Sequence, residues 1–169
     1  MPTSEQEVPV QRRYMYMSHA VSPFSPDDLA ALAMSSQREN GRRSITGILV
    51  HLEGHFLQLV EGPASAIGQL QKNLKADTRH RDVTDLLDEP VGRRLFDGWT
   101  LATERLFHRP DAPTSFAMEV ARRLSRVAHS DSDFQVLGML ARFWGDFADL
   151  ITLSEQQTQW HDAVLNKAP

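Results

Sequence analysis

Apolar and polar positions along the first hundred residues fall into seven segments with two different periods. Alternating or continuous apolar runs of five to eight residues predict strands, and apolar positions repeating every three or four residues predict helices. We expect strands at residues 12–18, 45–52, 56–61, 83–89 and 99–106, and helices after Ser25 and over residues 64–76. The order βαββαββ predicts an α+β, ferredoxin-like sheet with both helices on one face.

Local signals place the ends of these elements. Ser25-Pro26-Asp27-Asp28 combines a capping serine, a proline suited to the first turn and acids at the positive end of the helix dipole. Gly41 is expected to end that helix. Its inward face is predicted to carry Leu29, Leu32, Ala33, Ser36 and Asn40, and the inward face of the second helix Ile67, Leu70 and Leu74. Glu53-Gly54 is a typical hairpin turn.

The predicted third strand is apolar on both sides, so both faces of the sheet need a cover. Phe56 and Val60 share the face of Gln58, while Leu57 and Leu59 point the other way. We expect C-terminal helices to cover the second face. Their apolar positions are Phe116, Val120, Leu124 and Val127, then Phe134, Leu137, Leu140, Ala141, Trp144, Phe147 and Ile151, the latter set on a helix from about Asp133 to Leu150. Domain boundaries are therefore expected as a flexible N-terminus at 1–11, a folded domain at 12–106 and a helical extension at 107–169.

Composition narrows the function classes. With 169 residues and 41% hydrophobic content the chain can bury one real core, and its net charge of −4 argues against nucleic acid as a partner. It contains no cysteine, which removes disulfides and thiolate metal sites. The seven histidines are dispersed, and no metal site is expected. No apolar run is long enough to cross a bilayer, so we expect a soluble, cytoplasmic protein.

Gln58 is the residue that conflicts with its surroundings, because it places an amide in the middle of a buried strand. An unmatched buried amide costs about 1–3 kcal/mol, so its hydrogen bonds are expected to be used. Tyr16 on the first strand and Asn40 at the end of the first helix are the candidate partners. Such a neutral set suits a flat heterocycle rich in carbonyls and ring nitrogens, although Gln58 alone would also fit a core amide that binds neighbouring backbone.

These residues, in this order, resemble the BLUF family of flavin-binding blue-light sensors. The resemblance covers about residues 12 to 105 and lies in six short motifs. They are Tyr16-Met17-Ser18, Ser36-Gln37-Arg38-Glu39-Asn40, Ile45-Thr46-Gly47, Gly54-His55-Phe56-Leu57-Gln58-Leu59-Val60-Glu61-Gly62, Arg79-His80-Arg81-Asp82-Val83 with Glu89-Pro90, and Arg94-Leu95-Phe96-Asp97-Gly98-Trp99.

The resemblance implies a cofactor and roles for these residues. The flavin is expected to be FAD, with FMN or riboflavin possible, bound without a covalent bond. Gln58 is expected to bind the N5/O4 edge of the flavin, Tyr16 to bond to Gln58 and donate an electron, and Asn40 to hold the carbonyl edge. Ser36, Arg79 and His80 join the expected flavin-binding set, and Trp99 the photoactive set.

Several of these residues have ordinary alternatives. Arg79 and His80 could form a solvated turn rather than bind the flavin phosphate, and Trp99 could be ordinary core. Tyr14 shares a strand face with Tyr16 and is expected to lie near the surface without a photochemical role. Glu61 is expected to cap the second helix rather than act as a base.

Leu101 departs from the family pattern, since many members carry methionine there, and this puts in doubt how the fifth strand reports the photochemistry.

The sequence therefore predicts a photosensor and not an enzyme, with output through self-association or an unidentified protein partner. A homo-oligomer is expected, and neither nucleic acid nor membrane is expected as a partner. Two alternatives stay open: a small acylphosphatase-like hydrolase and a light-insensitive adaptor on the same fold.

Overall fold

The computed structural model describes residues 10–52, 54–96, 98–103, 126–140 and 142. The chain divides into two compact units, Met1–Asp111 and Ala112–Pro169. The first unit contains every residue that the sequence assigns to the candidate site.

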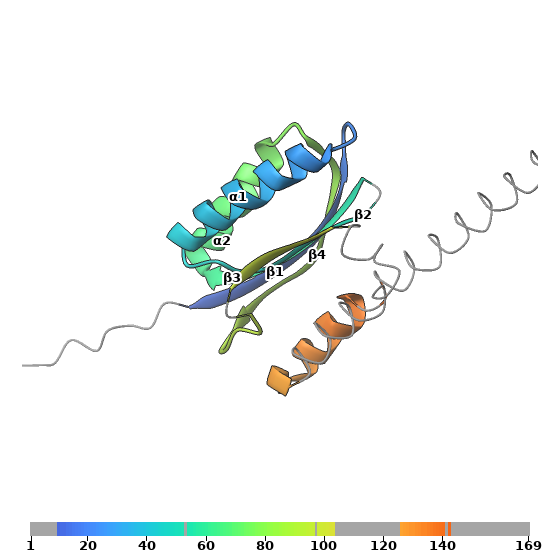
Figure 1. Ribbon diagram of the computed structural model, residues 1–169. Helices are drawn as coiled ribbons and strands as arrows, with labels where there is room; N and C mark the ends of the chain where they lie inside the picture. Colours follow the sequence, from blue (N-terminus) through green and yellow to red (C-terminus); the bar gives the residue numbers. More distant parts are fainter. Residues whose placement is uncertain (1–9, 53, 97, 104–125, 141, 143–169) are drawn as a thin grey trace, which may run out of the picture. The chain divides into compact units, whose positions relative to one another are not determined.

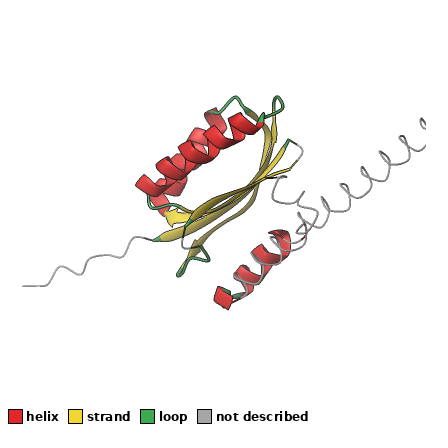
Figure 2. Cartoon of the chain, viewed as in Figure 1, coloured by secondary structure: helices red, strands yellow, loops and turns green. Residues whose placement is uncertain are grey.

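The first unit has the element order predicted from the sequence. Its elements are β1 (Gln11–Ala20), α1 (Pro26–Arg42), β2 (Thr46–Leu52), β3 (His55–Pro63), α2 (Ala64–Ala76), β4 (His80–Val91) and β5 (Trp99–Thr103). The strands form one sheet in the order β4-β1-β3-β2-β5, antiparallel except for the parallel pair of β2 and β5. Both helices lie on the same side of this sheet (Figures 1 and 2). The predicted α+β, ferredoxin-like fold is confirmed.

The start of α1 was predicted correctly, but its end was not. Ser25 caps its start: the serine side chain accepts from the Asp28 N–H, and the Asp28 side chain accepts from the Ser25 N–H. At the other end Gly41 does not stop the helix, which continues to Arg42. The chain leaves through Ser44 at φ 55° instead, and the Asn40 carbonyl accepts from the Ile45 N–H at 2.8 Å. This bond fixes the last turn of α1 to the start of β2.

The core between sheet and helices has two clusters. Leu32 of α1 packs with Leu49 and Phe56, and Ile67 and Leu74 of α2 pack with a second set formed by Tyr14, Tyr16, Ile45 and Val60. Residues directly paired in a sheet point to the same face. The pairs Tyr16↔Gln58 and Gln58↔Leu49 therefore place all three side chains on the helix side.

The second unit is described over residues 126–140 and 142, with helical residues at 126–127, 131–140 and 142. The longest of these helical stretches starts at residue 131. This stretch begins after Ser130, two residues before the predicted start at Asp133. The Ser130 hydroxyl accepts from the Asp133 N–H, and the Asp133 carboxylate accepts from the Ser130 N–H. Val136 and Leu140 are buried, whereas Phe134, predicted to be inward, is 55% exposed. The remaining predicted positions of both C-terminal stripes lie outside the described residues, apart from Val127 and Leu137, which are half-buried. A helical cover for the second sheet face stays a prediction.

Candidate functional site

Gln58 and Tyr16 form the centre of the site. They are directly opposite each other on β3 and β1, and the Tyr16 hydroxyl donates to the Gln58 Oε1 at 2.7 Å. Both are buried, with 3% of Tyr16 and 6% of Gln58 exposed. This bond uses the amide oxygen of Gln58, and the amide NH2 group has two further N–H donors.

Burial raises the pKa of the Tyr16 phenol well above its usual range, and the nearby negative charge of Asp77 adds to this effect. Tyr16 is therefore a neutral hydrogen-bond donor at any physiological pH. Loss of the Tyr16 proton therefore requires that an electron leaves the phenol ring or that a proton acceptor lies nearby.

Asn40 and Ser36 lie on α1 as predicted, facing inward to different extents. Asn40 is 6% exposed, and its backbone carbonyl is used by the Arg43 and Ile45 N–H groups. Ser36 is half-buried one turn earlier. Within the described residues, no side-chain hydrogen bond joins Asn40 to Tyr16 or Gln58, so the convergence of all three on a ligand stays a prediction.

Arg79 and His80 have different surroundings. The His80 side chain is buried, its Nδ1 lies 3.0 Å from the Ser18 Oγ, and its ring centroid lies 5.0 Å from that of Phe56. Burial lowers the pKa of His80, Asp77 opposes this, and Arg79 adds to the lowering. Arg79 is largely exposed and forms a two-pronged ion pair with Asp77. The His80 side chain thus lies in the protein interior beside Ser18 and Phe56, while binding of a phosphate by Arg79 would compete with Asp77.

Trp99 begins β5, where its backbone pairs with Gly47 of β2 and the Gly47 N–H donates to the Gly98 carbonyl at 2.8 Å. Leu101 pairs with Leu49 in the same ladder. The Trp99 side chain lies outside the described residues, so its distance from the site stays untested.

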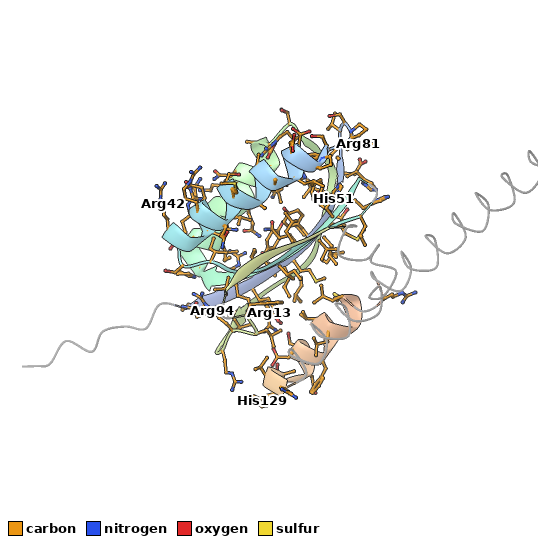
Figure 3. The ribbon with its side chains drawn as sticks, in the orientation of Figure 1. Arg13, Arg42, His51, Arg81, Arg94 and His129 are labelled. Atoms are coloured by element: carbon orange, nitrogen blue, oxygen red, sulfur yellow. The ribbon has the colours of Figure 1, made fainter. Side chains whose placement is uncertain are left out.

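The prediction for Glu61 is wrong. The start of α2 has no side-chain cap, and Glu61 is fully buried on the other face of the sheet. Its carboxylate accepts from the Arg13 Nε at 2.8 Å and from the Leu95 and Phe96 N–H groups at 2.7 and 3.0 Å. Arg13 and Arg94 lie at this end of the sheet in Figure 3. Glu61 therefore anchors the connection that leads into β5.

Tyr14 is also placed differently from the prediction. It is completely buried and its ring stacks on Tyr16, with centroids 5.5 Å apart and planes inclined by 25°. Its hydroxyl donates to the Asp85 carboxylate of β4. The prediction that Tyr14 lies near the surface is therefore wrong.

Sequence reasoning missed His51, although the signal that identified Gln58 applies to it equally. His51 is a 5% exposed polar residue in an apolar strand. It points to the helix side, where its ring lies 4.6 Å from Phe56 and 6.0 Å from Phe24 between centroids (Figure 3). Ser18 was likewise not assigned to the site, despite its place in the Tyr16-Met17-Ser18 motif.

Comparison with known proteins identifies the family to which this chain belongs. The family model for BLUF, described as sensors of blue light using FAD, matches residues 12–102, more than half of the chain. The chain belongs to the BLUF family. Its members are flavin-binding blue-light sensors, and FAD is the cofactor named for them.

Two curated relatives and two solved structures illustrate the family relationship. Over 94 residues the BLUF domain is 40% identical to the photoactivated adenylate cyclase subunit beta of Euglena gracilis, and 34% identical to the subunit alpha. These matches span 54% of this chain but only 11% and 9% of the relatives. The chain thus spans about a tenth of the length of the curated relatives it matches.

Among solved structures, the dark-state BLUF protein BlrB is 26% identical with a TM-score of 0.55, covering 71% of this chain and 98% of BlrB. BlrP1 of Klebsiella pneumoniae, solved with FMN and cyclic diGMP, is 29% identical with a TM-score of 0.65, covering 80% of this chain and 35% of BlrP1.

The residues on the helix side of the BLUF sheet fit a flavin. Gln58 and Asn40 supply neutral amide donors and acceptors in a buried setting, which matches ring carbonyls and ring nitrogens. Tyr16 and Phe56 supply buried aromatic surface beside them. When bound, the flavin supplies absorption of blue light and one-electron chemistry.

Within the described part of the chain, no cluster of three or more His, Cys, Asp or Glu side chains is arranged to hold a metal ion. In the same residues no helix is long and apolar enough to cross a membrane.

Proposed function

We propose that this BLUF protein is a reversible light switch in which the Tyr16–Gln58 hydrogen bond is the element that light rearranges. The observation that carries this proposal is the 2.7 Å bond between the two side chains in a buried, neutral setting. A bound flavin would absorb the light and take an electron from Tyr16, whose proton would pass to Gln58. Return of the electron and the proton to Tyr16 would then leave the Gln58 amide rotated or tautomerised, with a stronger hydrogen bond to the flavin O4.

FAD is held mainly through its ring system. Gln58 binds the N5/O4 edge, Asn40 the carbonyl edge, and Ser36 assists from the same face of α1. His80 lies beside Phe56 within the site, and Arg79 reaches the flavin phosphate when it releases Asp77. Because recognition centres on the ring, FMN or riboflavin also binds.

The output is a change in assembly rather than a reaction. The matched BLUF domain is a sensor domain. We therefore assign the output to self-association or to binding of another protein. Trp99 and β5 carry the change toward the partner. The connection into β5 is bonded to β3 through Glu61, and β5 itself pairs with β2.

The test is to load the full-length protein with FAD and record its absorption before, during and after blue light. We expect a small red shift that reverses in the dark. A protein that cannot be loaded with flavin would support the light-insensitive adaptor instead, and a loaded protein that shows only flavin reduction would refute the switch.

A further inference from the structure

Tyr14 and Tyr16 are the only two tyrosines of the chain, and they form a stacked pair inside the site. Both are buried, and both belong to the same apolar cluster beneath α2. Rings 5.5 Å apart between centroids are in van der Waals contact or nearly so. Electrons pass readily between aromatic rings at this separation.

The two phenols differ in what accepts their protons. The Tyr16 hydroxyl donates to the neutral amide of Gln58, whereas the Tyr14 hydroxyl donates to the carboxylate of Asp85. A carboxylate is a far stronger base than an amide oxygen. Tyr14, whose hydroxyl is not bonded to Gln58, thus has the better proton acceptor of the two tyrosines.

This contact depends on an irregularity in the sheet. Asp85 is paired with Tyr16 in the β1–β4 ladder, and the register shifts between Met15 and Tyr16, with Leu86 as the extra residue on β4. The shift brings the Asp85 carboxylate within reach of the Tyr14 hydroxyl. Asp88, which is paired with Tyr14, is instead bound by Arg12 and Gln71.

In the resting protein the pair is inert. Burial raises the pKa of Tyr14, and Asp85 raises it further through their hydrogen bond and their charges, so Tyr14 keeps its proton. Removing an electron from a phenol makes it a strong acid. Asp85 then becomes a positioned base for a proton that it does not take in the dark.

We propose that Tyr14 and Asp85 form a second electron and proton donor behind Tyr16. This inference rests on the proposed function, since the oxidant is light-excited flavin acting through Tyr16. After Tyr16 has lost its electron and passed its proton toward Gln58, Tyr14 transfers an electron to Tyr16, and the same proton returns to the Tyr16 oxygen. In this step the O–H bond of Tyr14 breaks and an O–H bond forms on Asp85.

The charges and electrons balance. The flavin has gained one electron, Tyr14 is a neutral radical and Asp85 is a neutral acid, while Tyr16 and Gln58 carry the protons they started with. In the dark the electron returns to Tyr14 and the proton returns from Asp85. The second donor therefore competes with the route that rearranges Gln58, and it holds the separated charge farther from the flavin.

The test uses the full-length, FAD-loaded protein frozen under blue light, with tyrosyl radicals counted by electron paramagnetic resonance. Deuterated tyrosine assigns the signal, because only two positions can give it. Tyr14→Phe removes the hydroxyl but keeps the stacked ring, and Asp85→Asn keeps a hydrogen-bond acceptor but removes the base. Asp88→Asn is the matched control, because it neutralises a carboxylate of the same strand that binds Arg12 and not Tyr14.

We expect the wild-type protein to accumulate a tyrosyl radical, and Tyr14→Phe and Asp85→Asn to lower its yield by on the order of 10²-fold, the usual contribution of a positioned base. Asp88→Asn should stay within about twofold of wild type, as expected for an exposed charge. In the flavin-free protein, Asp85→Asn should move the phenol carbon resonance of Tyr14 and leave that of Tyr16 in place.

An undiminished radical in either Tyr14→Phe or Asp85→Asn would overturn the inference, as would an equal loss in Asp88→Asn. Absence of any tyrosyl radical in a wild-type sample that still forms its red shift would overturn it too, and would leave the proposed function intact. A wild-type sample that binds FAD but forms no red shift would instead mark the failure of the proposed function, and the second donor would fall with it.

Discussion

At the scale of single residues, one amide determines the character of this site. Gln58 occupies a strand position where burial alone would favour a branched aliphatic side chain. Its carbonyl is satisfied by Tyr16 at 2.7 Å, and its N–H groups remain for other acceptors. An amide can both donate and accept, so turning it over changes what it offers to a ligand without moving a charge.

Gln58→Leu should therefore keep the fold and the flavin but abolish the red shift, because leucine has similar volume and no hydrogen-bonding group. The Tyr16 hydroxyl loses its acceptor, so the free energy of unfolding should fall by about 1–3 kcal/mol. Absorption under blue light and urea unfolding measure the two effects.

Gln69→Leu is the control for that experiment, since it makes the same change on an exposed position of α2. It should retain the red shift. A normal, reversible shift in Gln58→Leu would contradict the role assigned to the amide. Tyr16→Phe should also lose the shift, because phenylalanine lacks the hydroxyl that donates to Gln58.

Sequence alone identified Gln58 and Tyr16 but not the contacts of Tyr14 or Glu61. The first two stand out because a polar group in an apolar strand must have a partner. The others depend on strand register: the irregularity at Leu86 brings Asp85 to Tyr14, and the far face of β3 brings Glu61 to Leu95. No local pattern contains that information.

At the scale of elements, the sequence predicted order and type because each element carries its own signal. The capping box at Ser25 and the stripe on α2 are local, and both were confirmed. The end of α1 was missed because glycine permits a helix end without requiring one. Here Ser44 adopts the left-handed conformation, stabilised by the bond from its N–H to the Gly41 carbonyl.

Gly47, in β2, is the glycine at which an added side chain would be tolerated least. A Cβ there would lie 2.0 Å from the Leu59 carbonyl oxygen, and its φ of 149° is rarely adopted by other residues. Gly47→Ala should push β2 away from β3 and lower the free energy of unfolding by more than about 3 kcal/mol. Chemical denaturation measures this.

Gly41→Ala provides the matched comparison, because nothing lies within 4 Å of the added Cβ. It should be neutral or stabilise by up to about 1 kcal/mol, since alanine favours a helix more than glycine does. Equal effects of the two substitutions would show that the β2–β3 contact is not as close as described.

Glu61 joins β1, β3 and the connection that leads into β5 from the face opposite the helices. Glu61→Gln should cost about 3–5 kcal/mol of unfolding free energy, because it removes the fully buried negative charge that accepts from the buried Arg13 guanidinium at 2.8 Å. The exposed Arg12–Asp88 pair is the comparison, and Asp88→Asn should cost less than about 1 kcal/mol. A cost for Glu61→Gln no larger than for Asp88→Asn would refute the anchoring role.

At the scale of the whole molecule, the switch must act on an equilibrium between two states that already have similar free energies. Rearranging one or two hydrogen bonds changes stability by about 0.5–1.5 kcal/mol each. Driving a two-state element from 1:99 to 99:1 requires about 5.5 kcal/mol. Gln58 alone therefore shifts an existing equilibrium, and an association equilibrium is one that such small changes can move.

Light should accordingly change the assembly of the full-length protein. The described C-terminal helix exposes Phe134 and Met139, and apolar side chains of this kind favour association. Light-scattering mass measurements in the dark and under blue light should give a mass above that of one chain, with a different distribution in the two states. A single-chain mass in both states would exclude self-association and leave a protein partner as the output.

The most direct test of the central claim is the infrared difference between the illuminated and the dark FAD-loaded protein, in the region of the flavin C4=O stretch. A stronger hydrogen bond to O4 must lower the frequency of that carbonyl. We predict a reversible downshift in the wild-type protein that is absent from Gln58→Leu. A red-shifted absorption spectrum with an unmoved C4=O band, or a downshift that survives in Gln58→Leu, would contradict the account.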